Sequence, residues 1–455
     1  MSKLQFGGQQ KMIKVVKFGG SSLADAEQFR KVGRIIRKDA DRRYVVPSAP
    51  GKRTPDDTKV TDMLYGCYGV AIMEEEECEE EFESRLEKIK ERYDEIIEGL
   101  GLSMDLTDEF RMIRENFIRK TGRDYAASRG EYLNGRIMAE YLGYPFIDAA
   151  DVIFFDEDGN FDAKKTDQVL AEVLAEKKCA VIPGFYGSMP DGSVKTFSRG
   201  GSDITGSIVA KAVHADMYEN WTDVSGFLIT DPRIIPNPKA IDVITYRELR
   251  ELSYMGATVL HEDAIFPVRK EGIPINIRNT NIPEDKGTLI VESTCRKPRF
   301  VITGIAGKKD FASITVEKAM MNTEVGFCKK VLEVFSDNGI SIEHMPSGID
   351  TFTIFVHQDE FEEKEQKVIA GIHRAVEPDF LELESDLALI AVVGRGMRAT
   401  RGTSGRIFSA LAHANVNVKM IDQGSSELNI IIGVRNHDFE TAIRAIYDIF
   451  VNTML

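Results

Sequence analysis

An internal repeat in the last third of the chain restricts the possible folds more than any other feature of the sequence. When the sequence is shifted by 76 positions, residues 321–356 fall on residues 397–432 without a gap. The matched pairs are Met321 with Met397, Gly326 with Gly402, Lys330 with Arg406, Phe335 with Leu411, Ile340 with Val416, Ile342 with Val418, Gly348 with Gly424 and Val356 with Ile432. Each copy has the pattern of a strand, a glycine-containing loop, a helix, a strand, a polar turn and a strand. Such a match predicts two copies of one small α+β module.

The residues before the repeat alternate between strand-like and helix-like segments. The strand-like runs are KVVKF at 14–18, YVVPS at 44–48, PFIDA at 145–149, CAVIPGF at 179–185 and DMYENW at 216–221. This alternation predicts an α/β layer structure with a mostly parallel sheet. Ligands bind beyond the carboxyl ends of the strands in such sheets. The polar or glycine-rich segments at these ends are 19–20, 48–51, 184–187 and 222–223.

A chain of 455 residues is too long for one ordinary core, so two or three domains are expected. We expect an α/β domain over residues 12–298 and two α+β modules after it. The first module is placed at 310–383. The second combines 384–455 with the preceding segment 299–309, which could supply a strand to either module.

Composition excludes several classes of function. The formal net charge of −15 disfavours nonspecific binding to nucleic acid. The five cysteines form no CxxC pair, which argues against a zinc site or a disulfide framework and fits the reducing cytoplasm. The apolar runs are strand-sized, and the first twelve residues lack an apolar signal region, so neither a membrane span nor a signal peptide is expected. The acidic run 74–85 precedes apolar residues at helical spacing, which predicts a solvated helix face.

The segment TFSRGGSD at 196–203 is the first candidate for a ligand site. Arg199, two glycines, a serine and Asp203 stand directly before the apolar-periodic segment ITGSIVAKAV, at an expected helix start. Paired glycines allow close backbone approach, and free N–H groups at a helix start favour anions. An arginine can grip a carboxylate, and an aspartate can orient a cation. A glycine-rich turn with an aspartate cap is the alternative interpretation.

A second anion-ready loop, KFGGSS at 17–22, follows the first strand. Its N–H groups could hold phosphate oxygens, with Lys17 as a point charge. A simple strand-to-helix turn is the alternative. No GxxxxGK[ST] occurs in the chain, which excludes a Walker-type phosphate loop.

The stretch VVGRGMRA at 392–399 imitates a dinucleotide fingerprint, but it lies inside the second repeat copy, and the first copy has no matching glycines. We therefore do not expect NAD binding.

Six motifs in order make the chain resemble the aspartokinases. They are KFGGSS, PSAPG, SRGEYL, TFSRGGSD, NWTDVSGFLITDPR and GATVLHEDAIFP, and the resemblance runs from about residue 14 to 455. It implies a three-layer amino-acid-kinase domain of the carbamate-kinase type, with a mostly parallel sheet, followed by a pair of α+β ACT domains. The implied reaction is transfer of the ATP γ-phosphoryl, with Mg²⁺ bound to ATP, to the side-chain carboxylate of L-aspartate. This step opens the route to lysine, threonine and methionine. Because the chain ends at the second repeat, no fused homoserine dehydrogenase is expected.

The resemblance also implies roles for individual residues. Lys17 would contact the transferring phosphoryl group, and Asp203 would orient the Lys17 side chain. The implied nucleotide contacts, besides Lys17, are Gly19, Gly20, Ser21, Thr222, Asp223, Asp231 and Arg233. The implied aspartate contacts are Ser48, Glu131 for the ammonium, Arg199 for a carboxylate, Gly200, Gly201 and Ser202. No residue is assigned as a direct metal ligand.

Three departures from the family pattern stand out. Ser21 replaces the usual threonine, VVPSAPGKR replaces a VVSAMGG-type loop, and Thr258 stands where a lysine that helps bind ATP is common. Lys52, Arg53 or Arg233 could compensate for that lysine. His261 is interpreted as structural, because a carboxylate nucleophile is already ionised at pH 7. An inactive amino-acid sensor and a kinase for another acidic acceptor, such as glutamate, remain as alternatives.

The ACT pair implies binding of an end-product amino acid, lysine or threonine. The segments that resemble the pocket are 321–327 and 341–347, and the candidate contacts are Met321, Gly326, Phe327, Ser341, Glu343 and Ser347. A purely architectural pairing module is the alternative. Pairing of ACT domains across a two-fold axis would make the protein at least a homodimer.

Overall fold

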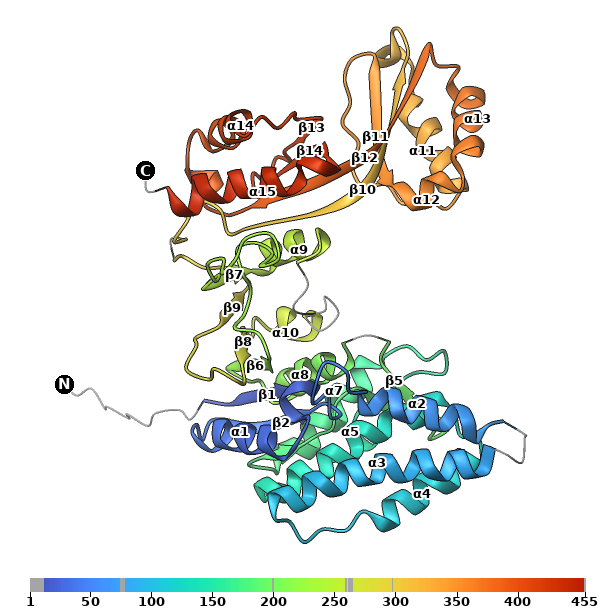
Figure 1. The fold of residues 1–455 in the computed structure, drawn as a ribbon, viewed down its shortest axis with the longest axis vertical. Helices are drawn as coiled ribbons and strands as arrows, with labels where there is room; N and C mark the ends of the chain where they lie inside the picture. Colours follow the sequence, from blue (N-terminus) through green and yellow to red (C-terminus); the bar gives the residue numbers. More distant parts are fainter. Residues whose placement is uncertain are drawn as a thin grey trace, which may run out of the picture. The chain divides into compact units, whose positions relative to one another are not determined.

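The computed structural model describes residues 12–73, 78–198, 200–257, 260, 265–296 and 298–453. The chain forms two compact units. The N-terminal unit contains Met1–Phe227, Asp242–Tyr246 and Val259–Thr294, and the C-terminal unit contains Leu228–Ile241, Arg247–Thr258 and Cys295–Leu455. Two short segments from the middle of the sequence thus belong to the C-terminal unit. Figure 1 identifies the elements of each unit by label and by colour along the chain.

The N-terminal unit is built on a seven-stranded sheet with the order β3-β2-β1-β6-β8-β9-β7. Its strands are β1 (Lys14–Phe18), β2 (Arg42–Pro47), β3 (Ala180–Val181), β6 (Met217–Thr222), β7 (Val243–Thr245), β8 (Ile275–Asn279) and β9 (Thr288–Val291). All neighbours pair in parallel except β8 with β9. The expected mostly parallel sheet is therefore confirmed. A separate hairpin joins β4 (Tyr186–Ser188) to β5 (Val194–Thr196).

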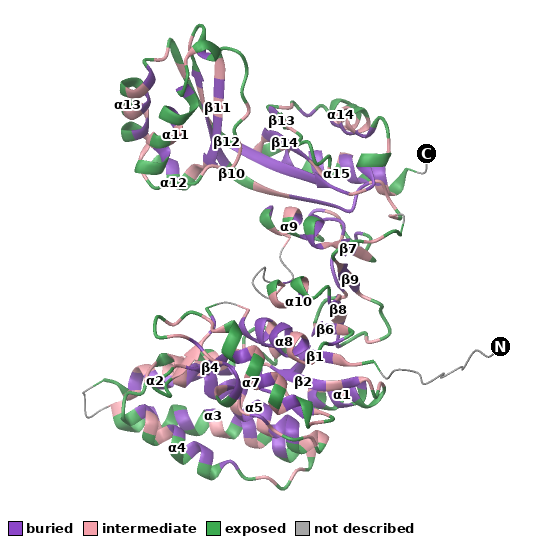
Figure 2. Ribbon diagram, turned by 180° about the vertical axis from the view of Figure 1, so that it is seen from behind, coloured by how far each residue is buried: buried purple, intermediate pink, exposed green. Residues whose placement is uncertain are grey.

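Helices cover both faces of this sheet, as the alternation of side chains along β6 demonstrates. Tyr218 and Asn220 bond to Asp203 on α8 (Gly201–Ala212), whereas Trp221 on the opposite face stacks on Phe18 in the core beside α1 (Ala26–Arg37). The other helices are α2 (Val60–Ala71), α3 (Cys78–Leu100), α4 (Thr107–Ile118), α5 (Arg123–Leu142), α6 (Ala149–Val152), α7 (Ala163–Ala175) and α10 (Phe266–Lys270), with the 3₁₀ turn η1 (Gly20–Leu23) after β1. Buried residues line the sheet and the helix faces that contact it (Figure 2).

The acidic segment before residue 86 forms the start of α3. Glu79, Glu80 and Glu81 are exposed, while Phe82 and Leu86 are buried. The prediction of a solvated helix face is confirmed for these residues, and the run at 74–77 lies outside the described residues.

The C-terminal unit contains both repeat copies, which share one antiparallel five-stranded sheet with the order β11-β10-β12-β14-β13. Three elements recur with a shift of 76 positions: β10 (Gly304–Glu317) as β12 (Phe380–Val393), η3 (Met321–Thr323) as η4 (Met397–Ala399), and α11 (Phe327–Asp337) as α14 (Thr403–His413). The remaining elements are β11 (Thr351–His357), α12 (Gln358–Glu362), α13 (Glu365–Val376), β13 (Met420–Asp422), β14 (Asn429–Arg435), η5 (Asn436–Asp438), α15 (Phe439–Tyr447) and η6 (Asp448–Asn452). Both α11 and α14 begin after a glycine with φ near 80°. The predicted repeat reappears in these elements, and the boundaries of the two modules stay a prediction.

The GxGxxA stretch has a packing role in this unit. A Cβ on Gly394 would lie 2.6 Å from the Cα of Ile302, and a Cβ on Gly396 would lie 2.5 Å from the carbonyl oxygen of Val301. Arg395 between them forms an ion pair with the buried Glu248 in α9 (Tyr246–Tyr254) at 2.8 Å. The glycines admit a neighbouring chain segment, which accounts for them without a dinucleotide.

No helix in the described part of the chain is long and apolar enough to cross a membrane.

Candidate functional site

Three polar side chains from separate elements form the centre of the candidate site. Lys17 Nζ lies 2.6 Å from Asp203 Oδ1, and Asn220 Nδ2 donates a hydrogen bond to the same oxygen at 2.9 Å. Lys17 and Asn220 are paired neighbours on β1 and β6, and Asp203 occupies the first turn of α8. Because Lys17 and Asn220 are buried, the Lys17–Asp203 attraction is screened less by water than a surface ion pair. The ammonium group is therefore held at a fixed position near the carboxyl edge of the sheet.

Two loops with glycine backbones meet beside this centre. The N–H of Gly19 donates to the carbonyl of Trp221 at 3.0 Å, and the N–H of Gly51 donates to the carbonyl of Gly20 at 2.8 Å. A Cβ on Gly20 would lie 2.8 Å from the carbonyl oxygen of Ala49, and a Cβ on Gly51 would lie 2.6 Å from the Gly20 backbone. Only glycine fits this close approach, since each added Cβ would meet backbone atoms. The loop at 19–22 is thus fixed by the loop at 48–51.

The second loop is itself held by a buried arginine. Arg92 on α3 donates to the carbonyl oxygen of Gly51 at 2.7 Å and forms an ion pair with Asp57 at 2.8 Å. Arg53 is also paired with Asp57, at 3.0 Å, and with Glu95, at 2.9 Å. Arg53 is therefore already paired, with Asp57 in its own loop and with Glu95 on α3, which disfavours its replacing the usual lysine at position 258.

Glu131 and Asn134 lie one turn apart on α5 and face the second loop. The N–H of Ala49 donates to the Glu131 carboxylate, and Asn134 Nδ2 donates to the Ser48 carbonyl at 2.6 Å. Both side chains are buried, and Glu131 Oε2 and Asn134 Oδ1 have no hydrogen-bond partner among the described residues. Burial raises the pKa of Glu131 to about 8, although the Ala49 N–H and the charge of Lys17 favour its ionised form. Two buried acceptors without partners suit a ligand that carries several N–H donors.

The glycine segment at 200–202 starts α8 as predicted. Gly200 has φ of 59°, a left-handed conformation, and its carbonyl accepts from the N–H of Asp203 at 2.9 Å. A Cβ on Gly184 would lie 2.6 Å from the Ser202 side chain, so the helix start packs tightly against that loop. Arg199, Thr258 and His261 lie outside the described residues.

The expected nucleotide residues divide between the two units. Thr222 ends β6 in the N-terminal unit and Asp223 follows it, and Thr222 Oγ1 donates to Asp223 at 3.2 Å. Asp231 and Arg233 belong to the C-terminal unit and form an ion pair with each other at 2.6 Å. The N-terminal unit by itself therefore contains Lys17, the two loops, Asp203 and Glu131, and it does not contain the Asp231–Arg233 pair.

The expected effector segments lie in the first ACT-like module of the C-terminal unit. Met321 and Phe327 are buried in its core, and Ser341 is exposed. Glu343 lies 3.4 Å from His357 Nε2 with a side chain only 6% exposed. Tyr254 also contacts Glu343, and burial together with that hydrogen bond raises the pKa of Tyr254 to about 12. A nearly buried carboxylate with polar neighbours is suited to a cationic amine.

Metal ligands are sparse in the described part of the chain. No group of three or more His, Cys, Asp or Glu side chains there is placed to hold a metal ion. The Asp203 oxygen nearest Lys17 is already engaged by two donors. A divalent ion at this site would fit these residues best if a phosphate ligand supplied most of its oxygens, as Mg²⁺ commonly requires.

Sequence reasoning missed two residues of this site, Asn134 and Asn220. Asn220 occurs in the strand motif YENWT, directly before Trp221. Alternation along a strand could have placed it on the face opposite Trp221. The sequence does not reveal that this face is also that of Lys17.

Comparison with known proteins places this geometry in context. Residues 12–279 match the amino acid kinase family, and residues 390–450 match an ACT domain. The chain is 38% identical to aspartokinase 3 of Bacillus subtilis over 453 residues, covering 96% of this chain and 98% of that protein.

Solved structures of aspartate kinases resemble the chain over nearly its whole length. The crystal structure of Clostridium acetobutylicum aspartate kinase is 52% identical, with a TM-score of 0.86 over 96% of this chain and 100% of that one. Escherichia coli aspartokinase III, crystallised with aspartate and ADP, is 24% identical, with a TM-score of 0.69 over 96% of this chain and 99% of that one. This last similarity concerns the fold alone.

The Glu131→Gln variant should gain stability relative to the wild type as the pH rises. The folded chain holds the Glu131 proton with a pKa of about 8, against an ordinary value of 4.5. The protonated carboxyl thus contributes stability that is complete below about pH 4.5 and is lost as the pH rises through about 8. Glutamine stays neutral at every pH. The free energy of unfolding of the wild type should therefore fall relative to that of the variant between about pH 5 and about pH 8.

Urea denaturation at a series of pH values measures this shift. Glu140→Gln is the matched control, because Glu140 is exposed on the same helix. A pH-independent difference for Glu131→Gln, equal to that of the control, would contradict the buried protonated carboxyl.

Proposed function

The chain belongs to the aspartokinases of the amino acid kinase family, and from this premise we propose that phosphoryl transfer takes place at its Lys17–Asp203 centre. The reaction is the ATP-dependent phosphorylation of the side-chain carboxylate of L-aspartate to 4-phospho-L-aspartate. The observation that carries the proposal is the buried ammonium of Lys17, fixed by Asp203 and Asn220 beside the two glycine loops.

Lys17 and the loop amides supply the positive potential for the reaction. In phosphoryl transfer the charge spreads over the oxygens of the moving group, so catalysis depends on positioning and on fixed positive groups. Lys17 Nζ would contact the γ-phosphoryl, while the N–H groups of Gly20 and Ser21 and the Ser21 hydroxyl would bind phosphate oxygens. The Gly19 N–H already donates to the Trp221 carbonyl, so Gly19 would contribute close backbone approach instead. Asp203 and Asn220 orient Lys17 before substrate arrives, which lowers the reorganisation needed in the transition state. Mg²⁺ bound with ATP neutralises further phosphate charge when present.

Glu131 and Asn134 are suited to the α-ammonium of aspartate. Their unpartnered oxygens would accept its N–H donors, and the arriving positive charge would favour the ionised form of Glu131. Ser48 and the 200–202 segment would bind the substrate backbone and Arg199 a carboxylate. The acceptor carboxylate is ionised at neutral pH, so no general base is needed.

The nucleotide would extend from the loops toward the end of β6. Thr222 and Asp223 follow Asn220 by two and three positions and would contribute polar groups there. Asp231 and Arg233 are assigned to the same ligand because the TDV…DPR motif matches the family pattern. Arg233 is exposed, and its pairing with Asp231 would have to loosen if the guanidinium is to bind phosphate.

Regulation is assigned to the ACT pair. The related Clostridium acetobutylicum enzyme is described as allosteric. In this chain Glu343, with Ser341 and Ser347, would bind the ammonium groups of lysine or threonine, and Met321, Gly326 and Phe327 would line the same pocket. The effector must bind one arrangement of the protein more tightly than another, and the coupling to substrate affinity is then reciprocal. Pairing of ACT modules between chains would form the homodimer.

The five cysteines are all free thiols, which supports a cytoplasmic location. The alternative of an inactive sensor is disfavoured by the intact Lys17–Asp203–Asn220 arrangement, since a sensor has no need of a preorganised ammonium. A glutamate kinase is disfavoured because the relatives that match the chain over nearly its whole length are aspartokinases.

Activity should be abolished by Lys17→Ala. The wild type should form aspartyl hydroxamate from ATP, aspartate and hydroxylamine, with glutamate a poor acceptor. Removing the ammonium deletes the main fixed positive charge, and a loss of about 100-fold or more in kcat is expected. The hydroxamate assay measures both effects, and Lys88→Ala on the exposed face of α3 serves as the control.

A wild-type enzyme that is inactive with every acceptor would favour the sensor alternative. A Lys17→Ala variant with nearly normal kcat would refute the phosphoryl role while leaving the family assignment untouched.

Lysine or threonine, singly or together, should inhibit the enzyme or shift its thermal midpoint. Glu343→Gln should weaken that response about tenfold or more, because a buried carboxylate would lose its charge–charge contact with the effector amine. Effector titrations of activity and of the melting temperature measure this, with the exposed Glu360→Gln as the control. Indifference of the wild type to both amino acids would favour an architectural ACT pair.

A further inference from the structure

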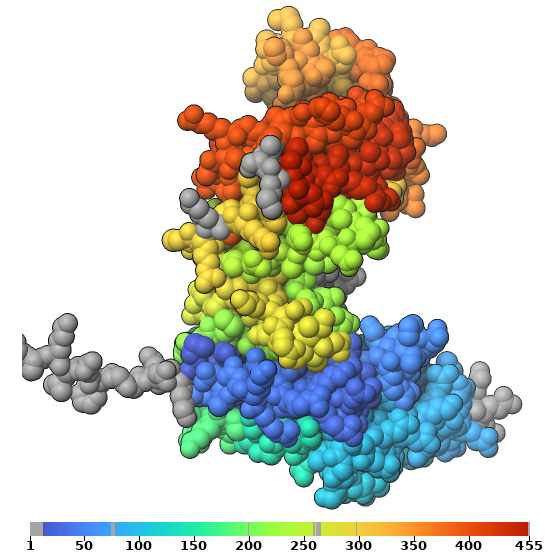
Figure 3. All heavy atoms as spheres, turned by 60° about the vertical axis from the view of Figure 1, so that its left-hand side comes forward, coloured from blue at the N-terminus to red at the C-terminus, as the bar shows by residue number. Residues whose placement is uncertain are grey.

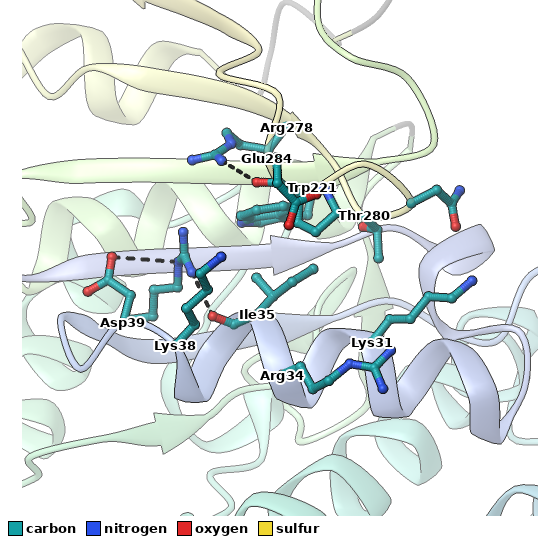
Figure 4. Close-up of a pocket in the computed structure, with 12 residues that line it drawn as sticks. Lys31, Arg34, Ile35, Lys38, Asp39, Trp221, Arg278, Thr280 and Glu284 are labelled. Carbon is teal, nitrogen blue, oxygen red and sulfur yellow. Dashed lines mark hydrogen bonds and ion pairs between the residues drawn. The ribbon is translucent and has the colours of Figure 1, made fainter.

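A groove on the N-terminal unit has the properties of a second ligand site. It has a volume of about 780 Å³, within the range of roughly 300–1,000 Å³ of small-molecule sites. It is lined by α1, the start of β2, the ends of β6 and β8 and the β8–β9 loop. Figure 4 shows its lining side chains, and in Figure 3 the yellow β8–β9 loop lies above the blue surface of α1.

The groove lies on the sheet face opposite the catalytic centre. Trp221, which lines the groove, points away from the face where its neighbour Asn220 bonds to Asp203. Trp221 is 1% exposed, so it forms a wall behind the surface rather than a platform for stacking. The aspartate and ATP contacts proposed above do not use this face. A ligand of the groove would therefore be distinct from either substrate.

Positive charge dominates the lining. Five cationic side chains face two carboxylates: Lys31, Arg34, Lys38, Arg42 and Arg278 against Asp39 and Glu284. Asp39 is already neutralised by Lys14 at 2.6 Å, which lies outside the lining. Arg42 and Lys31 are likewise paired with carboxylates outside the lining, Glu219 at 2.8 Å and Glu27 at 3.5 Å. The remaining positive excess comes from Arg34, Lys38 and Arg278 against Glu284.

The cationic side chains differ in how many ion-pair or hydrogen-bond partners they have within the protein. Arg42 is paired with the buried Glu219 at 2.8 Å. Arg278 bonds through one terminal nitrogen to the Pro283 carbonyl at 2.7 Å, while its Nε is buried without a partner among the described residues. Arg34 and Lys38 have no side-chain partner in the described part of the chain, and both are exposed on the helix side. Burial lowers the pKa of Arg278, and the nearby charge of Glu219 opposes that shift.

The two sides of the groove are held rigidly. Trp221 lies between the guanidinium groups of Arg42 and Arg278, whose central carbons are 5.1 Å and 4.7 Å from the ring centroid. The Thr280 N–H donates to the carbonyl oxygen of Thr222 at 2.8 Å. The hydroxyl oxygen of Thr280 lies 2.8 Å from the hydroxyl oxygen of Ser22 in η1. A groove with fixed walls binds at a lower entropic cost than a surface cluster of flexible lysines.

We propose that this groove is a binding site for a small organic anion carrying at least two carboxylate or phosphate groups. One anionic group would bind Arg278, and a second would bind Arg34 and Lys38 on α1. Guanidinium groups suit both oxyanion types. The site is separate from the proposed substrate and effector sites.

Calorimetric titration of the full chain tests the proposal, with citrate and inorganic pyrophosphate as separate probes. Saturating ADP and aspartate occupy the active site, and Mg²⁺ is omitted because both probes chelate it. At least one probe should bind with one site per chain under these conditions. Citrate alone would assign the site to carboxylates, and pyrophosphate alone would assign it to phosphates.

The double variant Arg34→Gln with Lys38→Gln should weaken that binding about tenfold or more, because two charge-assisted contacts are lost. The control is Lys88→Gln with Arg111→Gln, which removes the same charge from exposed positions on α3 and α4. Both variants should keep the wild-type rate of hydroxamate formation in the absence of the probes, which separates this site from the catalytic one. Absence of binding by both probes, or equal weakening by the two double variants, would overturn the proposal.

Discussion

The ion pair between Lys17 and Asp203 is the interaction on which the rest of the site depends. It joins the end of β1 to the first turn of α8, and Asn220 on β6 fixes the shared carboxylate oxygen. Each partner is placed by a different physical cause: β1 and β6 by their parallel register, and α8 by the left-handed turn at Gly200. Without the Asp203 carboxylate, the buried Lys17 ammonium would lose its hydration and gain no partner in return.

Glycine backbones extend this arrangement to the ligands. The contact between Gly20 and Gly51 places two loops from separate strands against each other, and α5 supports the second loop through Asn134 and Glu131. The result is a site with positive charge at one end and buried acceptors at the other. Aspartate and ATP have the complementary distribution, an ammonium on the acceptor and the negative charge on the phosphates.

Sequence patterns predicted the architecture well because it depends on local periodicity. The 76-residue shift reappears in the bounds of β10 and β12, and the strand–helix alternation reappears as the parallel sheet. Patterns could not predict contacts that need register between distant segments. Asn220 and Asn134 gain their roles from pairing with Lys17 and with the Ser48 loop, and the groove beside Trp221 is assembled from four separate elements. The division between the units also cuts the TDV…DPR motif, which no local pattern indicates.

The rate of the chemical step in Asp203→Asn tests the central claim most directly. Asparagine keeps the size of the side chain but removes the charge that orients Lys17, and Asp203→Glu keeps the charge with a longer reach. Rapid-quench measurement of a single turnover should give a rate about 100-fold lower for Asp203→Asn, with the affinity for ATP changed far less. A single-turnover rate within about twofold of the wild type would contradict the account, because Lys17 would then be positioned without Asp203.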